Sequence, residues 1–357
     1  MHSEISHHAI IGWDIGGAHL KAVALVDGQV VAVEQTACPL WQGLLELEAA
    51  LDRILDRVPS CSRSRHVVTM TGELTDAFKS RTEGVLAITE VVTRRFGLES
   101  VHLFTGDKAP IPAADVSAEI AGRIASANWL ASGWSVAGRL CHGLFMDVGS
   151  TTTDLLLIEN HQPCFRGYTD SERLHQQELM YTGIVRTPVM MMAQAAPLRG
   201  QWAPVMAEVF ATSADVYRLT GELQEAADQY PSADHGPKSP AGSHLRLARQ
   251  FGFDAEELGT KSLLQLAAYL REQHIQQLRS GVEIQLSLGY LDDRAPLIGA
   301  GTGRFLVKEL ALRLQRPYRD FGELFQGNPA SAGFALSDVA PAAAVAFLGF
   351  DNTPDAP

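Results

Sequence analysis

The strongest constraint on this chain is an internal repeat of one strand-turn-strand unit. Asp14-Ile-Gly-Gly-Ala-His-Leu-Lys21 aligns by its acid with Asp147-Val-Gly-Ser-Thr-Thr-Thr-Asp154, and apolar strands flank both turns. A repeat of this kind predicts two lobes, each opened by one copy of the unit. We therefore expect an N-terminal lobe over residues 1–140 and a C-terminal lobe over residues 141–357.

Short apolar runs alternate with helical patterns along the chain, which predicts an α/β fold. Asp27-Gly28 between two apolar runs is a hairpin signal. The expected strands are 9–13, 22–26, 29–33, 66–70, 101–104, 143–147, 155–159 and 295–298. The expected helices are 43–58, 84–96, 115–130, 262–283, 305–314 and 342–347. The segment 231–243, rich in Pro, Gly, Ser and His, predicts a mobile surface loop, with an active-site flap as the alternative.

Composition excludes several classes of protein. With 46% hydrophobic and 20% charged residues, the 357-residue chain has the profile of a soluble enzyme. Its formal net charge of −12 argues against nucleic-acid or anionic-membrane partners. No apolar run approaches a membrane span, the polar start is unlike a signal peptide, and four scattered cysteines fit reduced thiols. We therefore expect a cytoplasmic protein.

The first turn has the residues of an anion site. Gly16 and Gly17 let the backbone approach a ligand and aim N–H groups at a phosphate, and Lys21 adds a positive charge. Asp14 and Asp147 each end a strand, where a carboxylate binds Mg²⁺ directly or through water in a diphosphate site. The alternative is that both acids accept hydrogen bonds from their own turns.

The second turn adds hydroxyl groups. Gly149, Ser150, Thr151 and Thr152 would supply amide and hydroxyl donors for further phosphate oxygens, although a threonine run is also ordinary strand material. Asp154 replaces Lys21 in the repeat and could act as a base or a second metal ligand. The glycine-rich turn Gly299-Ala-Gly-Thr-Gly303, which includes Gly301, opens a helix and would form a third anion or nucleotide contact. Such turns also serve packing alone.

In this order, the three glycine turns resemble those of the sugar kinase/Hsp70/actin superfamily. That resemblance implies a two-lobed, actin-like ATPase (ribonuclease H-like) fold with a cleft between duplicated lobes. Within it the chain is most similar to the hydantoinase A/oxoprolinase-like branch and its tetrahydromethanopterin-linked one-carbon transfer pathway proteins. The segments that carry this likeness are residues 13–21, 70–78, 146–154, 181–187, 210–217 and 297–303.

The resemblance implies a transferase of methanofuran or methylofuran biosynthesis. It would join an aminomethyl-furanmethyl diphosphate to the phenol oxygen of a tyrosine, tyramine or glutamylated acceptor and release diphosphate, with Mg²⁺ or Mn²⁺ as cofactor. The furan ring delocalises the developing cation, so the protein must mainly stabilise the leaving group. Asp154, Glu73 and Asp76 are the candidate bases, and Arg186 would clamp a carboxylate or phosphate oxygen, with an ordinary ion pair as its alternative.

Two other functions stay open at this point. The superfamily turns also suit an ATP-dependent small-molecule kinase or a hydantoinase/oxoprolinase-type hydrolase, which would form ADP. A non-catalytic nucleotide-binding protein of the one-carbon pathway is the third hypothesis. The sequence leaves the acceptor and the oligomeric state open, a homodimer included.

Overall fold

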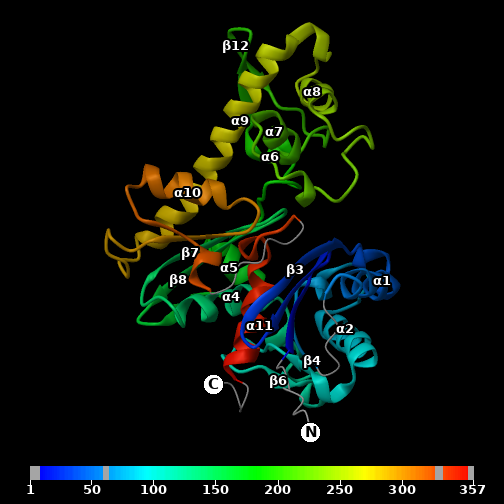
Figure 1. Cartoon of the computed structure of the whole chain (residues 1–357). Coiled ribbons are helices and arrows are strands. Elements are labelled where there is room, and N and C mark those ends of the chain that lie inside the picture. The colour runs from blue at the N-terminus through cyan, green and yellow to red at the C-terminus, as the bar shows by residue number, and fades with distance from the viewer. Residues whose placement is uncertain (1–8, 59–63, 326–332, 353–357) are drawn as a thin grey trace. The chain divides into compact units, whose positions relative to one another are not determined.

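A computed structural model describes residues 9–58, 64–325 and 333–352 of the chain. The chain divides into two compact units, and neither is one continuous segment (Figure 1). The first unit contains Met1–Gly143, Leu156–Cys164 and Asp320–Pro357, and the second contains Leu144–Leu155 and Phe165–Arg319. The expected single boundary after residue 140 therefore differs from this division, because the last 38 residues group with the first unit.

The first unit is built on a six-stranded sheet in the order β3-β2-β1-β4-β5-β6. β1 pairs antiparallel with β2 and parallel with β4, and β4 continues in parallel to β5. Asp27 and Gly28 join β2 to β3 with φ values of 50° and 77°, which confirms the expected hairpin turn. The strands are β1 (Ala9–Ile15), β2 (His19–Val26), β3 (Gln29–Ala37), β4 (Ser64–Met70), β5 (Val101–Leu103) and β6 (Ile111–Pro112).

One face of this sheet is covered by α1 (Leu44–Leu55) and α2 (Arg81–Phe96). Alternate residues of a strand point to the same face, and Ile11, Trp13 and Ile15 share one buried cluster with the apolar stripes of both helices. Ser80 caps α2 by accepting a hydrogen bond from the Glu83 N–H, and Gly97 ends it. The expected helices 43–58 and 84–96 are thus confirmed to within a few residues at their ends.

The C-terminal helix α11 (Ala340–Asp351) packs against the other residues of β1. Its contact with Gly12 is so close that a Cβ there would lie 2.2 Å from the Ala342 carbonyl oxygen. Figure 1 shows this helix in red beside the blue strands of the first sheet. This packing is the physical reason that the C-terminal segment belongs to the first unit. Asp14, two residues after Gly12, lies on the same side of β1.

The expected helix 115–130 is wrong. The structure has a single helical turn, α3 (Ala121–Ile124), and a separate helix, α4 (Asn128–Ala137). The chain breaks between them because Ala125 is extended and Ser126 takes a positive φ of 52°. Hydrophobic spacing alone could not reveal this break, which turns the Ser126 hydroxyl toward Glu73.

The second sheet repeats the plan of the first. Its order is β10-β8-β7-β13-β14, with β9 paired to β8. β13 pairs in parallel with β7 as β4 does with β1, and β7 and β8 contain the second copy of the repeat. The strands are β7 (Gly143–Val148), β8 (Thr153–Glu159), β9 (Gln162–Cys164), β10 (Leu179–Met180), β13 (Leu297–Ala300) and β14 (Tyr318–Asp320).

A long helix, α9 (Ala255–Leu286), organises the rest of the second unit (Figure 1). It extends the expected helix 262–283 at both ends and is interrupted at Gly259, whose φ is 71°. Its first half shares a buried apolar cluster with α6, α7, α8 and the hairpin β11–β12. The remaining elements are α5 (Asp170–His175), α6 (Val189–Met192), β11 (Ala195–Leu198), β12 (Gln201–Pro204), α7 (Ser213–Thr220), α8 (Pro240–Arg249) and α10 (Arg304–Arg313).

The expected α/β class is confirmed, because helices and strands alternate along the chain. Each of the two large sheets starts from a copy of the repeated strand-turn-strand unit, although most of β8 and all of β9 group with the first unit. In the described part of the chain, no helix combines the length and the apolar character that crossing a membrane requires.

Candidate active site

The first turn connects β1 to β2 and is closed by a hydrogen bond from the Gly16 N–H to the His19 carbonyl (2.9 Å). Asp14 and Lys21 are directly opposite each other in the antiparallel register. Their side chains form an ion pair, with 3.3 Å between Lys21 Nζ and Asp14 Oδ2. The lysine keeps 24% of its side-chain surface exposed, against 3% for the aspartate, so its charge remains accessible to an anion.

Asp14 has one oxygen that the ion pair does not use. Its Oδ1 is buried and has no hydrogen-bond partner among the described residues. A buried carboxylate oxygen without a partner is costly and points to a missing cation, donor or water. The alternative that Asp14 only accepts hydrogen bonds from its own turn does not account for this oxygen.

The segment that follows β4 lies against the first turn. The Thr71 N–H donates to the Ile15 carbonyl (3.0 Å), and Gly72 is so near that a Cβ there would lie 3.1 Å from the same oxygen. Glu73, in this segment, is buried and accepts a hydrogen bond from the Ser126 hydroxyl (2.8 Å). Asp76, three residues later, is exposed. The structure thus brings Glu73 into the unit that holds the first turn and leaves Asp76 at its surface.

The second turn has the same internal geometry as the first. The Gly149 N–H donates to the Thr152 carbonyl at 2.9 Å, the same distance and spacing as in the first copy. Asp147 and the residues of the turn are all half-buried. The aligned acids and glycines of the repeat therefore occupy equivalent places in two turns of one kind.

The 181–187 segment packs directly on this turn. The N–H groups of Ile184 and Arg186 donate to the carbonyls of Gly149 (3.0 Å) and Ser150 (2.9 Å). Gly183 is required at this contact, because a Cβ would lie 2.6 Å from the turn's backbone. Arg186, in the same segment, is exposed, and no carboxylate of the described residues forms an ion pair with it. Its alternative role as an ordinary ion pair is therefore not supported.

The glycine-rich turn between β13 and α10 also contacts the second turn. Gly301 has a φ of 79°, and a Cβ on it would lie 2.2 Å from the Val148 carbonyl and 2.4 Å from Asp147 Oδ1. The Gly303 N–H donates to the same Val148 carbonyl (2.8 Å). Gly301 and Gly303 therefore serve close packing, which is the alternative that the sequence left open. The Gly303 N–H already donates a hydrogen bond within the protein, so it is not available to an anion.

Asp154 has a partner that the sequence did not indicate. Arg173 in α5 donates from Nη2 to Asp154 Oδ1 (2.9 Å) and to the Glu178 carbonyl (2.9 Å), and its side chain is only 2% exposed. The guanidinium compensates the negative charge that replaces Lys21 in the second copy of the repeat. This ion pair occupies one carboxylate oxygen of Asp154, so the residue is less suited than Glu73 to act as a free base.

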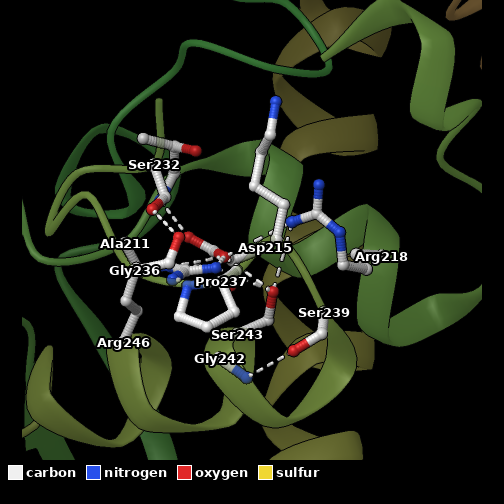
Figure 2. A network of polar contacts seen from close by, with 12 residues as sticks. Ala211, Asp215, Arg218, Ser232, Gly236, Pro237, Ser239, Gly242, Ser243 and Arg246 are labelled. Atoms are coloured by element: carbon white, nitrogen blue, oxygen red, sulfur yellow. Dashed lines mark hydrogen bonds and ion pairs between the residues drawn. The ribbon is translucent and has the colours of Figure 1, made fainter. Parts of the chain in front are cut away.

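A cluster of buried charges surrounds the start of α7 (Figure 2). Arg246, fully buried, donates from Nε to Asp215 Oδ1 (2.8 Å) and from Nη1 to Asp234 Oδ1 (3.1 Å). Asp215 Oδ2 accepts from the Thr212 N–H and closes the capping box of α7. The expected loop 231–243 is therefore tied to the protein at Asp234, and its last four residues form the first turn of α8.

A metal site formed entirely by protein ligands is not found among the described residues. The described residues contain no group of three or more His, Cys, Asp or Glu side chains that could hold a metal ion. Mg²⁺ often takes only one or two carboxylates and completes its shell with phosphate oxygens and water. The unpartnered Oδ1 of Asp14 fits that mode of binding.

Comparisons with known proteins agree with this architecture. The hydantoinase/oxoprolinase family model matches residues 65–340. The chain is 28% identical, over 84% of its length and 88% of the relative's, to the (4-{4-[2-(gamma-L-glutamylamino)ethyl]phenoxymethyl}furan-2-yl)methanamine synthase of Methanocaldococcus jannaschii. The enzyme of the same name from Methanococcus vannielii is 26% identical over 35% of this chain and 55% of its own.

Among solved structures, the nucleotide-free acetone carboxylase superposes with a TM-score of 0.54 at 11% identity. The superposition covers 84% of this chain and 66% of that one, and it shows a shared fold alone. The family model, in contrast, spans most of the chain, including the second turn, the 181–187 segment and the glycine-rich turn. The protein belongs to the hydantoinase/oxoprolinase family.

Proposed function

We propose that this protein is a transferase of methanofuran or methylofuran biosynthesis. It would join a furanmethyl carbon to a phenol oxygen and release diphosphate. The observation that carries the proposal is the 28% identity to a phenoxymethyl-furan methanamine synthase over nearly the full length of both proteins. The two repeated turns, with Lys21 at one and Arg186 beside the other, support an anionic substrate.

In the proposed reaction, the bond between the furanmethyl carbon and the diphosphate oxygen breaks, and that oxygen keeps the electron pair. The phenol oxygen forms the new bond to the same carbon and gives up its proton to a carboxylate. Both turns are proposed to bind phosphate oxygens. Donors that stabilise the departing negative charge lower the barrier most, because the furan ring itself stabilises the carbon centre.

We assign the anion contacts as follows. Gly16 and Gly17 would donate backbone N–H groups, and Lys21 would supply the cation at the first turn. At the second turn, the backbone N–H of Arg186 donates to the Ser150 carbonyl, and the residue is exposed. Its guanidinium would therefore lie near the turn and be available to an anion. Ser150, Thr151 and Thr152 would add hydroxyl donors there.

For the proton acceptor we propose Glu73. Its hydrogen bond from the neutral Ser126 hydroxyl orients the carboxylate, whereas Asp154 is held by the cationic Arg173 and Asp76 lies exposed. Glu73→Gln should lower kcat by roughly 10²- to 10⁴-fold, the usual contribution of general-base catalysis. Asp76→Asn is the matched control and should leave kcat within about threefold.

A divalent metal fits the first turn, where the buried Asp14 Oδ1 would hold it. Asp147, in the second turn, stays a predicted metal ligand. When bound, Mg²⁺ or Mn²⁺ would neutralise charge on the diphosphate. Asp147→Asn is nearly isosteric, so it should abolish metal-dependent turnover and leave the fold intact. Unchanged turnover would remove Asp147 from the metal site.

Diphosphate release tests the proposal directly. The protein would be incubated with the synthetic aminomethyl-furanmethyl diphosphate, Mg²⁺ and, in turn, tyrosine, tyramine or their glutamyl forms. We expect diphosphate and an aryl ether from at least one acceptor without ATP. No turnover across the panel rejects the proposed function.

Membership of the hydantoinase/oxoprolinase family favours one other candidate, an ATP-coupled hydrolase or small-molecule kinase. It predicts one ADP per product and no reaction in the absence of ATP. The two candidates are therefore separated by omitting the nucleotide from the same assay.

A further inference from the structure

We infer that His274 is a positioning residue for the second turn, acting through Thr182 and the 181–187 segment. The inference rests on the proposed role of this turn in binding phosphate oxygens. His274 comes from the middle of α9, outside every motif segment, and its side chain is fully buried.

The 181–187 segment determines where the second turn lies. Ile184 and Arg186 bind the Gly149 and Ser150 carbonyls, and on the strand side the Thr153 hydroxyl donates to the Thr182 carbonyl (2.8 Å). These hydrogen bonds run from both ends of the turn to one short segment. A shift of that segment must therefore move the turn or break its hydrogen bonds.

Buried hydroxyl groups fix the segment from behind. Thr187 Oγ1 accepts from the Gly183 N–H (2.8 Å) and donates to the Gly183 carbonyl (2.9 Å). The Ser213 hydroxyl, at the start of α7, donates to the same carbonyl (2.8 Å), and its N–H donates to the Thr187 carbonyl (2.7 Å). The segment is thus closed on itself and attached to α7.

His274 completes this network with both ring nitrogens. Nε2 lies 2.8 Å from Thr182 Oγ1, and Nδ1 lies 2.6 Å from the Tyr217 hydroxyl oxygen. Burial, and then the charge of Arg271, lower the pKa of His274 to about 4, so the ring is neutral near pH 7 and has one donor and one acceptor. The imidazole therefore connects α7 and α9 to the segment.

The direction of the hydrogen bonds can be assigned. Thr187 gives its hydroxyl proton to the Gly183 carbonyl, so toward Thr182, 3.4 Å away, it can only accept. Thr182 then donates to Thr187 and accepts from His274 Nε2–H. Nδ1 must be the acceptor for the Tyr217 hydroxyl, whose pKa burial raises far above its usual value. The assignment predicts the Nε2–H tautomer.

Two amide substitutions separate positioning from simple packing. Gln at position 274 places an N–H donor where Nε2 lies and keeps the bond to Thr182. Asn places a carbonyl acceptor where Nδ1 lies and keeps only the bond to Tyr217. We expect the affinity for inorganic pyrophosphate to fall by roughly tenfold in His274→Asn, the equivalent of one hydrogen bond, and by less than about threefold in His274→Gln.

Hydrogen exchange of the 184–186 amides provides a readout that needs no activity. Exchange there should be roughly tenfold faster in His274→Asn than in His274→Gln, relative to the amides of α2 in the same protein. His66→Gln removes a buried histidine from the first unit and is the matched control, with exchange at 184–186 unchanged. Equal exchange at 184–186 in the two His274 variants would overturn the inference. If the wild-type protein binds no pyrophosphate, the proposed function of the turn fails, and the exchange comparison still decides the positioning role.

Discussion

At the scale of single residues, Asp14 and Lys21 show how an ion pair stabilises a buried charge at the first turn. The lysine is partly exposed and the aspartate is almost fully buried, so the aspartate needs the opposite charge of its partner more than the lysine does. Removal of the cation strands a buried carboxylate, whereas removal of both charges leaves a neutral site. Stability and activity should therefore respond to different substitutions.

Lys21→Met should lower the free energy of unfolding by about 1–3 kcal/mol, less than a fully buried pair would because Lys21 is partly solvated. Asp14→Asn combined with Lys21→Met should recover most of that loss, and neither variant should turn over the furan diphosphate. Urea unfolding and the diphosphate-release assay measure the two effects. A double variant no more stable than Lys21→Met would show that the ion pair does not stabilise the buried Asp14 carboxylate.

Two buried histidines should make stability depend on acid. Burial first, and then nearby arginine charge, lower the pKa of both His66 and His274 to about 4. Between pH 4 and pH 6.5 the unfolded chain binds protons that the folded chain does not. The free energy of unfolding is therefore unaffected by these histidines above pH 6.5. As the pH falls from 6.5 toward 4, it decreases by about 3 kcal/mol for each histidine.

We expect the His66→Gln/His274→Gln variant to lose less stability than the wild type between pH 7 and pH 4.5. Urea unfolding at the two pH values measures the difference, and each protein serves as its own reference. The same decline in both proteins would mean that other groups cause the acid sensitivity.

At the scale of structural elements, the glycine-rich turn requires glycine either for close packing or for anion binding, and substitutions can distinguish the two. Gly301 and Gly200 have nearly the same positive φ, 79° and 78°, but a Cβ meets the Val148 carbonyl at the first and nothing within 4 Å at the second. Gly200→Ala is thus a matched control for backbone strain, which costs about 1 kcal/mol.

Gly301→Ala should lower the free energy of unfolding by at least about 2 kcal/mol more than Gly200→Ala, because the added carbon displaces β7 next to Asp147. It should also weaken pyrophosphate binding, whereas Gly200→Ala should not. Thermal unfolding and pyrophosphate titration provide the measurements. Equal effects of the two substitutions would show that Gly301 is not needed for packing.

Elements whose signals are local could be predicted from the sequence. The repeat identified both turns, Asp27-Gly28 predicted a hairpin that the structure contains, and the spacing of leucines predicted α1. The helix predicted at 84–96 begins three residues earlier, after the Ser80 cap that the sequence analysis did not use. The break between α3 and α4 could not be predicted, because Ser126 leaves the helical conformation for a contact with Glu73, 53 residues earlier.

The same limit applies to the candidate site. Glycines and acids at fixed spacing identified the two turns, but Arg173 and His274 have no motif around them and act through tertiary contacts alone. Tyr217 lay within a motif segment, yet its partner His274 is 57 residues away. Residues that position a site, unlike those that form its turns, therefore emerge only from the packed structure.

At the scale of the whole molecule, the chain does not build its units in sequence order. A helix was predicted where α11 lies, but its packing on β1 was not. That packing requires glycine at position 12, because a Cβ there would lie 2.2 Å from the Ala342 carbonyl oxygen of α11. The first unit is thus completed by the last residues of the chain. Any truncation that removes α11 uncovers the side of β1 on which Asp14 lies.

The central claim concerns which bond the enzyme breaks, and an oxygen label decides it. A phenolic amine acceptor carrying ¹⁸O in its hydroxyl group would be incubated with the furan diphosphate and Mg²⁺ in the absence of ATP, and the products analysed by mass spectrometry. The account predicts that the label appears in the aryl ether and that the released diphosphate is unlabelled. Label in a phosphorylated product, or a reaction that proceeds only with stoichiometric ADP formation, would contradict it.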